Sequence, residues 1–358
     1  MALATLHPLS AAGLLLTDWC PAACRHCYVS CGPGGRAWMA LEDAEAHFSA
    51  LARLNVAAEA IHLGGGEPFG DFERLLAVVR AARRAGLDGV GYVETCGYWA
   101  TSEEIVRDRL GALAQAGMRQ ISISADPYHQ EFVPPDRVRI LYAAAREALG
   151  PDGVRARRWR WLKACCTTKA VSATGGLSAS ARAGKPPVAP ILEEEPRNVS
   201  ALPEAARLKL FCAFLRRYPE RMTGRAARDL AALVDRVPLD EIAPGPCCQP
   251  LLEGCHVHVG PQGWVYPGTC AGIALGRAGP GRPLDRLLRE WRGEGSPIVE
   301  ALARGGPRAL ADDARAHGFE PDPQGYAGKC HLCWSVRTFL ARAGAGGEEL
   351  QPEAVYAG

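Results

Sequence analysis

The sequence contains no apolar run that approaches the roughly 18 residues needed for a membrane-spanning helix, so no membrane partner is expected. No Lys or Arg precedes Cys20, so the apolar start lacks the charged beginning of a secretory signal peptide. The net charge is only +2, which gives no overall electrostatic reason to expect an anionic partner. Nucleic acid is therefore not expected as a partner either.

Cysteine, in contrast, is abundant. The 14 cysteines fall mostly in groups, at positions 20, 24, 27 and 31, at 165 and 166, at 247, 248, 255 and 270, and at 330 and 333. Grouped cysteines favour metal sites over a disulfide framework, and thiolate metal sites need reducing conditions, so we expect a cytoplasmic protein. The length of 358 residues, with 48% hydrophobic and 22% charged residues, is ordinary for a globular chain of about two domains.

The first cysteine group follows an apolar stretch at residues 14–16. It reads Asp-Trp-Cys-Pro-Ala-Ala-Cys-Arg-His-Cys-Tyr, which spaces Cys20, Cys24 and Cys27 along one short loop. Three such thiolates can hold three irons of a cubane cluster and leave the fourth iron open to a substrate or cofactor. An open metal position is typical of catalytic sites. The alternative is a zinc knuckle, which usually needs Cys-x-x-Cys pairs and a fourth ligand.

A second motif follows at residues 60–69. It reads Ala-Ile-His-Leu-Gly-Gly-Gly-Glu-Pro-Phe, an apolar strand that runs directly into three glycines, a glutamate and a proline. Glycine allows the backbone to approach a ligand closely, because no side chain intervenes. Alone, such a turn is usually a tight loop between a strand and a helix. After the cysteine loop, and in this order, it indicates a cofactor site.

Together the two motifs resemble the signatures of the radical S-adenosylmethionine (SAM) superfamily. The resemblance implies a [4Fe-4S] cluster on Cys20, Cys24 and Cys27, with SAM at its open iron. It also places His26 and Tyr28, which flank Cys27, at the cofactor. The turn that would hold the amino group of the methionine moiety, through backbone carbonyls and the acidic side chain, consists of Gly64, Gly65, Gly66, Glu67 and Pro68.

Apolar runs alternate with amphipathic ones along residues 1–150, the pattern of βα units around a parallel sheet. We expect strands at 13–17, 58–63, 89–95 and 119–125, and helices at 41–54, 71–85, 102–116 and 136–149. Gly86, Gly117 and Gly150 stand where left-handed residues end helices. The predicted fold class is α/β: an incomplete (β/α)6 TIM-type barrel over residues 1–240, then a small Cys-rich extension with a β-hairpin over 241–358. Functional groups of such barrels gather at the carboxyl ends of the strands, where both motifs fall.

The end of the fourth expected strand carries more polar residues. Ser122 and Ser124 alternate with isoleucines, so they should face the barrel mouth while the isoleucines pack against helices. By the resemblance, Ser122, Ser124 and Asp126 contact the ribose or carboxylate of SAM; the alternative is that they cap the next helix. His129 belongs to a run, Asp-Pro-Tyr-His-Gln-Glu-Phe-Val-Pro, that resembles a signature of a little-characterised branch of the superfamily. His129 is our candidate catalytic residue, against the alternative of a hydrogen-bonded loop histidine.

The clean alternation is lost after residue 150. Residues 153–192 contain eight Lys or Arg and no acidic residue, and arginines mix with tryptophans over 154–163. This run predicts a fifth strand with a basic face; the alternative is a surface for a peptide or single-stranded nucleic acid. Residues from about 170 to 192 are rich in Ala, Ser, Gly and Pro and predict a flexible insertion. The turn at 221–227 resembles the one after the last barrel strand of the superfamily, which would complete six βα units.

A second set of cysteines lies in the C-terminal third. Residues 255–270 predict a β-hairpin, because apolar positions alternate on both sides of a Pro-Gln-Gly turn. The hairpin would bring its flanking cysteines together, and a Cys-x-x-Cys pair further on can share one metal with them. The arrangement resembles the SPASM or shorter twitch extension of radical SAM enzymes and implies one auxiliary [4Fe-4S] cluster; the alternative is structural zinc. The expected ligands are Cys255, Cys270, Cys330 and Cys333, with Cys247 or Cys248 as substitutes for Cys255.

The resemblance also implies a reaction. An electron from a donor such as flavodoxin or ferredoxin would cleave SAM to methionine and a 5'-deoxyadenosyl radical, which abstracts hydrogen from a substrate. In many relatives with such extensions the substrate is a ribosomally made peptide, so we expect a maturase-like oxidoreductase or transferase. Radical dehydrogenation of a small molecule would leave the same motifs. An iron–sulfur electron carrier would explain the cysteines but not the turn at 64–68, and a zinc-stabilised binding module would rest on the basic segment alone.

Overall fold

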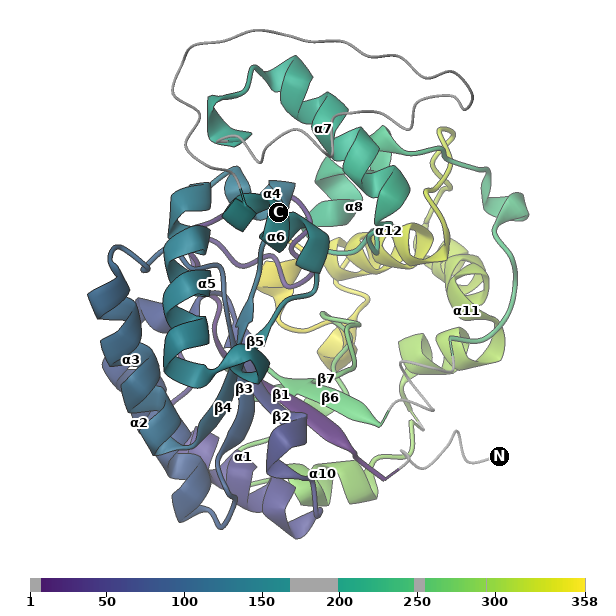
Figure 1. Ribbon diagram of the computed structural model, residues 1–358. Coiled ribbons are helices and arrows are strands. Elements are labelled where there is room, and N and C mark those ends of the chain that lie inside the picture. Colours follow the sequence, from purple (N-terminus) through teal and green to yellow (C-terminus); the bar gives the residue numbers. More distant parts are fainter. Residues whose placement is uncertain (1–7, 168–198, 248–254, 294, 358) are drawn as a thin grey trace, which may run out of the picture.

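The computed structural model describes residues 8–167, 199–247, 255–293 and 295–357 (Figure 1). The predicted insertion at about 170–192 and the substitute ligand Cys248 lie outside these residues.

The centre of the fold is an eight-stranded sheet with the strand order β5-β4-β3-β2-β1-β6-β7-β8. Neighbours from β5 to β6 run parallel, whereas β6, β7 and β8 pair antiparallel. The predicted α/β class with a mostly parallel sheet and a C-terminal hairpin is confirmed. The strands are β1 (Ala11–Thr17), β2 (Ile61–Gly65), β3 (Val90–Thr95), β4 (Met118–Ile123), β5 (Val154–Arg155), β6 (His256–Val259), β7 (Trp264–Pro267) and β8 (Gly276–Arg277).

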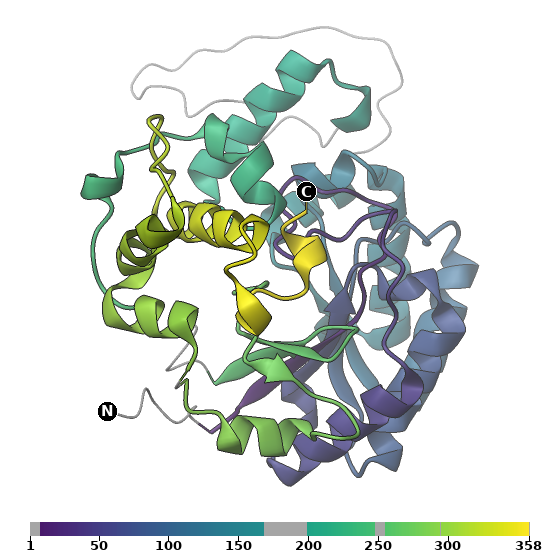
Figure 2. The ribbon, with the colours of Figure 1, turned by 180° about the vertical axis from the view of Figure 1, so that it is seen from behind.

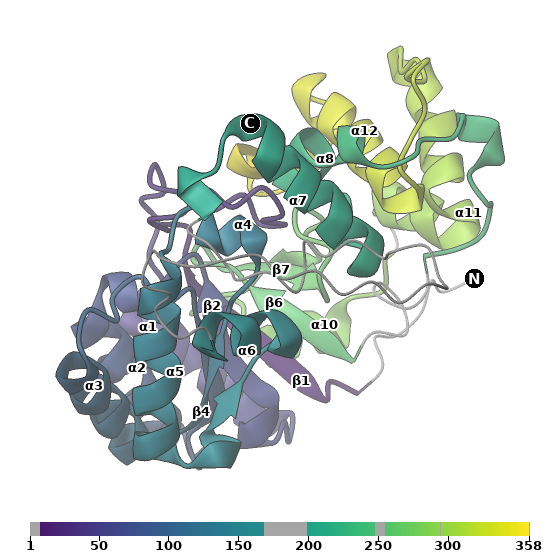
Figure 3. The ribbon, with the colours of Figure 1, turned by 45° about the horizontal axis from the view of Figure 1, so that its top comes forward.

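Helices cover the outer face of the parallel strands. Successive helices from α1 to α3, then α5 and α6, pack side by side there, and α11 packs against α12 beyond the hairpin (Figures 1 and 2). The short α4 packs against α7 above the strand ends (Figure 3). The helices are α1 (Leu41–Arg53), α2 (Phe72–Arg84), α3 (Glu103–Ala116), α4 (Pro127–Gln130), α5 (Pro135–Leu149), α6 (Trp159–Thr167), α7 (Glu204–Arg217), α8 (Arg225–Asp229), α10 (Leu284–Glu290), α11 (Pro297–Ala314) and α12 (Lys329–Arg342).

Local signals explain where these helices begin and end. The Ser102 hydroxyl accepts a hydrogen bond from Ile105 N–H at the start of α3, as a helix N-cap does. The predicted terminating glycines, Gly86, Gly117 and Gly150, have φ angles of +88°, +120° and +77°. These angles strain any residue with a side chain, so glycine ends each helix there.

The predicted fifth strand forms at the start of the basic run but is shorter than the run. Only Val154 and Arg155 pair with β4, and α6 follows from Trp159. Among the described residues no strand directly precedes the turn at 221–227. The sixth parallel strand is instead β6, the first strand of the predicted hairpin, and it pairs with β1 at the opposite side of the sheet. The hairpin is therefore part of the barrel sheet.

The C-terminal elements share one hydrophobic core with the barrel. The described core cluster includes Phe48 of α1 as well as Leu287 of α10. A bidentate ion pair between Arg53 and Asp285, at 2.7 and 3.2 Å, links the same two helices. The domain boundary at 240/241 remains a prediction. Among the described residues, no helix combines the length and apolar character that a membrane span requires.

A buried hydrogen-bond chain at the end of the molecule gives a stability prediction. Arg337 Nη1 donates to the Tyr356 hydroxyl over 2.6 Å, and that hydroxyl donates to the Gly272 carbonyl over 2.6 Å. Tyr356→Phe removes the hydroxyl that donates to the buried Gly272 carbonyl, whereas Arg337 Nη1 keeps the Ala271 carbonyl as an acceptor at 3.0 Å, so we expect a loss of about 2 kcal/mol in the free energy of unfolding in urea. Tyr142→Phe, which removes an exposed hydroxyl bonded to Arg146, should cost less than about 0.5 kcal/mol. Equal losses in the two variants would contradict the prediction.

Candidate functional site

The cysteine loop begins where β1 ends, at the carboxyl edge of the sheet. Cys20 and Cys24 are buried and Cys27 is half-buried, and all three line one cavity of about 200 Å³, called the central cavity below. Eight further residues that the sequence predicted for the site line the same cavity: His26, Tyr28, Gly65, Gly66, Ser122, Ser124, Asp126 and His129. Motifs that are far apart in the sequence therefore meet at one place above the strand ends.

One arginine holds the cysteine loop in shape. Arg225, the first residue of α8, donates from Nε to the Cys24 carbonyl over 3.0 Å and from Nη2 to the Cys31 carbonyl. Its backbone N–H donates to the Cys27 carbonyl over 3.0 Å. The Gly224 backbone is equally close, because a Cβ there would lie 2.5 Å from the Cys27 carbonyl oxygen. The turn at 221–227 is thus a support for the cysteine loop.

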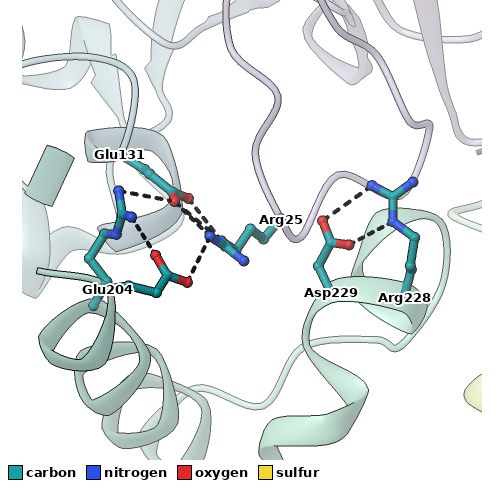
Figure 4. Close-up of polar contacts among 6 residues, drawn as sticks. Arg25, Glu131, Glu204, Arg228 and Asp229 are labelled. Atoms are coloured by element: carbon teal, nitrogen blue, oxygen red, sulfur yellow. Dashed lines mark hydrogen bonds and ion pairs between the residues drawn. The ribbon is translucent and has the colours of Figure 1, made fainter.

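A second support comes from Arg25, within the cysteine loop. Figure 4 shows its guanidinium pointing to the carboxylates of Glu131 and Glu204. The Glu131 oxygens lie 3.0 to 3.2 Å from the guanidinium nitrogens and the Glu204 oxygen lies 3.5 Å away. The Glu131 side chain is only 8% exposed, so water screens this pair less than a surface pair. The contacts fasten the loop to α4 and α7.

The glycine turn packs directly on the cysteine loop. Gly66 N–H donates to the Thr17 carbonyl over 2.7 Å, and Glu67 N–H donates to the Trp19 carbonyl over 2.8 Å. A Cβ on Gly66 would lie 1.9 Å from the Trp19 carbonyl oxygen, and one on Gly65 would lie 2.6 Å from that of Thr17. Glycine is required here because two backbones touch. The bare backbone of Gly65 and Gly66 also faces the central cavity.

The Glu67 side chain fastens this turn to β3. It is fully buried, and its carboxylate accepts hydrogen bonds from the Thr95 hydroxyl at 2.9 Å and from Cys96 N–H at 2.7 Å. Burial raises the pKa of Glu67, although these donors act in the opposite direction. Gly64, Glu67 and Pro68 are not among the described residues that line the central cavity. Their contact with the cofactor remains a prediction.

Three titratable side chains form a compact group at the cavity wall. Asp126 Oδ2 lies 2.9 Å from His129 Nδ1 and 3.4 Å from His26 Nε2. Asp126 also accepts hydrogen bonds from the N–H groups of Tyr128 and His129, so it caps α4 as the alternative interpretation proposed. The capping role and the place at the cavity coexist.

The charges of this group follow from its surroundings. Burial opposes charge on His129, but the Asp126 carboxylate outweighs burial and raises the pKa of His129. Burial lowers the pKa of His26 to about 4. Burial would also raise the pKa of Asp126, yet the two histidines hold it below its usual range. Asp126 is therefore ionised at neutral pH, and His129 is the member of the group most able to change charge.

The sequence analysis missed several residues of the cavity wall. Glu94 is the main one, because burial raises its pKa to about 7. It lies directly opposite Ser122 in the register of β3 and β4, so the alternation that selected Ser122 could have selected Glu94 too. The cavity wall also includes Cys31, Cys96, Arg157 and Arg158.

Three of the four predicted C-terminal ligands lie near one another. Cys330 and Cys333 lie in the first two turns of α12, and burial raises the pKa of Cys270 to about 12, with further contributions from both of these thiols. Arg337, which is 1% exposed and hydrogen-bonded to Cys333, lies beside them. Cys255 is exposed at the start of β6. The ligand set of the C-terminal site remains a prediction.

A comparison with protein families decides between the interpretations of the cysteine loop. Residues 14–166, from within β1 to within α6, match the family described as the Radical SAM superfamily. The chain carries a radical SAM domain. This domain implies a [4Fe-4S] cluster and SAM as cofactors. The residues around the central cavity fit both, with three thiols and a bare glycine backbone on one cavity.

Two solved structures are similar to this radical SAM chain at low identity. BtrN in complex with AdoMet and 2-DOIA is 13% identical with a TM-score of 0.43, and the similarity covers 84% of this chain and 89% of BtrN. Native anSMEcpe with bound AdoMet and Cp18Cys peptide is 13% identical with a TM-score of 0.41, covering 93% of this chain and 96% of anSMEcpe. No curated protein matches the sequence.

The contact of the glycine turn with the cysteine loop can be tested. Gly66→Ala places a methyl group against the Trp19 carbonyl, so the turn must move away from the loop. We expect SAM cleavage, measured anaerobically as 5'-deoxyadenosine formation, to fall by about 10²-fold, the effect of a misplacement near 1 Å. Gly34→Ala is the matched control, because a Cβ at Gly34 has no neighbour within 4 Å. Equal rates in both variants would show that the contact does not position the site.

Proposed function

We propose that this radical SAM enzyme abstracts a hydrogen atom from a peptide held at the central cavity and acts as a maturase-type oxidoreductase. One observation carries the proposal: the cysteine loop, the bare glycine backbone and the group of His26, Asp126 and His129 all line that cavity. A reduced [4Fe-4S] cluster with bound SAM supplies the 5'-deoxyadenosyl radical. The chain's own residues bind, orient and exchange protons.

The binding roles follow from position. Cys20, Cys24 and Cys27 would ligate the cluster, in a loop held by Arg225. The backbone of Gly65 and Gly66 would receive the methionine moiety of SAM. Ser122 and Ser124, whose hydroxyl-bearing face is turned to the cavity, would bind the ribose of SAM.

His129 is proposed to move a proton. Oxidation of a substrate radical releases one electron and one proton. The auxiliary cluster would accept the electron, and the proton needs a group that changes charge near neutral pH. Neutral His129 would take that proton, and the resulting imidazolium would remain beside the Asp126 carboxylate, 2.9 Å away. Glu94, on the same cavity, is a second group with a pKa near neutrality.

The shape of the site supports an extended substrate. A second cavity of about 430 Å³ adjoins the central cavity, and Val29, Cys31 and Gly65 line both. It lies between the cysteine loop and C-terminal segments that include Gln262 and Val355. Two neighbouring cavities suit a peptide segment better than a compact small molecule.

The C-terminal cysteines and the electron donor complete the proposal. One auxiliary cluster near the second cavity would be held by Cys270, Cys330 and Cys333, with Cys255 as the fourth thiolate. A flavodoxin or ferredoxin would deliver the electron. The predicted cytoplasmic location is compatible with an auxiliary cluster and with such an electron donor, because iron–thiolate sites need reducing conditions.

The charge change of His129 can be measured directly. Histidine proton NMR of the anaerobic protein should show His129 titrating above its usual pKa of about 6.5, because the Asp126 carboxylate favours the protonated ring. In Asp126→Asn the carboxylate that raises the pKa of His129 is lost while burial still lowers it, so the midpoint should fall. An unchanged His129 midpoint would remove Asp126 as its electrostatic partner.

The reaction itself is tested under anaerobic conditions. The protein is reconstituted with iron and sulfide, reduced and given SAM, and 5'-deoxyadenosine is measured by mass spectrometry. We expect nucleoside formation in the wild type and in Cys212→Ala, a control on α7, but none in Cys24→Ala. About eight irons per chain are expected if both cysteine sets hold four-iron clusters. Four irons with zinc at the second site would leave the radical enzyme intact and remove the auxiliary cluster.

A further inference from the structure

Three histidines that no part of the proposed mechanism uses gather on the inner side of the sheet. His62 of β2 and His258 of β6 lie in one row with Gly13 of β1, the strand between them. His256 stands two residues before His258 and so faces the same side. The ring centroids are 4.5 to 5.4 Å apart, and one nitrogen from each ring lies within 4.8 Å of the other two.

This histidine cluster is separate from the cysteine loop. Gly13 precedes Thr17, the last residue of β1, by four residues, which places the row about 13 Å below the strand end. The described lining of the central cavity does not include the three histidines. Tyr28 lies between the two regions, since it lines the cavity and its ring is 6.2 Å from that of His258.

Glycine at position 13 makes the space in which the rings meet. A Cβ there would lie 2.5 Å from atoms of both the His62 and the His258 rings. His62 and His258 are only 5% and 4% exposed. The Tyr92 ring stacks on His62 with an interplanar angle of 6° and fixes its orientation. Two buried imidazoles are thus held in place across a strand that has no side chain at the crossing.

The three histidine rings have more nitrogen lone pairs than there are hydrogen-bond donors to satisfy them. His258 Nδ1 lies 2.6 Å from the Gly268 carbonyl, which can only accept, so Nδ1 carries the proton and Nε2 of the neutral ring carries a lone pair. That Nε2 lies 3.2 Å from His62 Nε2. One proton between them would satisfy this pair, but the buried His256 Nε2 has no hydrogen-bond partner. Three converging nitrogens are satisfied together by a cation that accepts several lone pairs.

We propose that His62, His256 and His258 bind one divalent transition-metal ion of the zinc type. With metal–nitrogen bonds of about 2.0–2.1 Å, a tetrahedral ion holds its ligands roughly 3.3 Å apart, close to the Nε2 separation of His62 and His258. The Gly268 carbonyl is the outer partner that orients a ligating imidazole. Burial lowers the pKa of each of the three rings, which keeps them in the neutral form that metals bind.

The ion would join the hairpin to the barrel. His62 belongs to the N-terminal half of the sheet, whereas His256 and His258 belong to the hairpin strand that pairs with the other side of β1. An ion bound to histidines of both strands would fix the position of β6 relative to β2 inside the barrel. Three protein ligands leave one coordination position for solvent.

The test uses the anaerobic protein with its iron–sulfur sites filled. A small excess of Zn²⁺ is added, loosely bound metal is removed by gel filtration, and zinc is counted by mass spectrometry. We expect one zinc per chain, with a zinc-edge X-ray absorption spectrum that shows nitrogen at about 2.0–2.1 Å and no sulfur at about 2.3 Å. Absorption at the zinc edge is not disturbed by iron.

Two variants and one control decide the outcome. His258→Gln and His256→Gln should each lower zinc affinity at least tenfold, while His47→Gln, which removes another buried histidine on α1, should leave zinc bound. His256 is half-buried, so its variant keeps the test valid if His258→Gln fails to fold. The proposal is overturned by a folded wild type without zinc, by sulfur in the zinc shell, or by undiminished zinc in the His256 variant.

Discussion

The contact of two backbones, at the ends of β1 and β2, is the constraint on which the active site depends. The cysteine loop follows β1, the glycine turn follows the neighbouring parallel strand β2, and the two segments contact each other where the strands end. Gly66 and Glu67 donate hydrogen bonds to the carbonyls of Thr17 and Trp19. No side chain fits between them. Because both partners are backbone, the position of the cysteine loop relative to the cavity-lining glycines is set by the sheet register. The contacts of Arg225 and Arg25 then hold the far side of the loop.

The sheet divides its residues by face, and this division places the chemistry. Leu63, Val93 and Ile121 are fully buried on the face that packs against the helices. The opposite face carries titratable groups at two levels: Glu94 opens into the central cavity, and the histidine cluster lies below it. Charge inside a barrel is costly unless it is neutralised or paired, which is why Glu94 has a raised pKa and Asp126 is paired with histidines.

Much of the fold followed from local pattern. The first four strands and the helices between them were predicted because each repeats a period that its own residues define, and because glycines such as Gly117 end the helices. The fifth strand predicted over the basic run forms only at Val154 and Arg155, since arginines mixed with tryptophans suit a strand and a short helix such as α6 alike. The sequence analysis also did not predict that the hairpin belongs to the barrel sheet. Its pairing with β1 joins segments separated by most of the chain, and no local pattern specifies such a partner.

The site divides in the same way. The sequence by itself determined the cofactor chemistry, because the spacing of Cys20, Cys24 and Cys27 and the glycines after β2 are properties of short continuous segments. Tertiary structure alone decided what surrounds them. Glu67 supports the glycine turn from a buried position, and Glu94 lies in the cavity wall, because burial and hydrogen-bond partners depend on elements distant in sequence. The histidine cluster is the clearest case, since it exists only where β6 folds back beside β1.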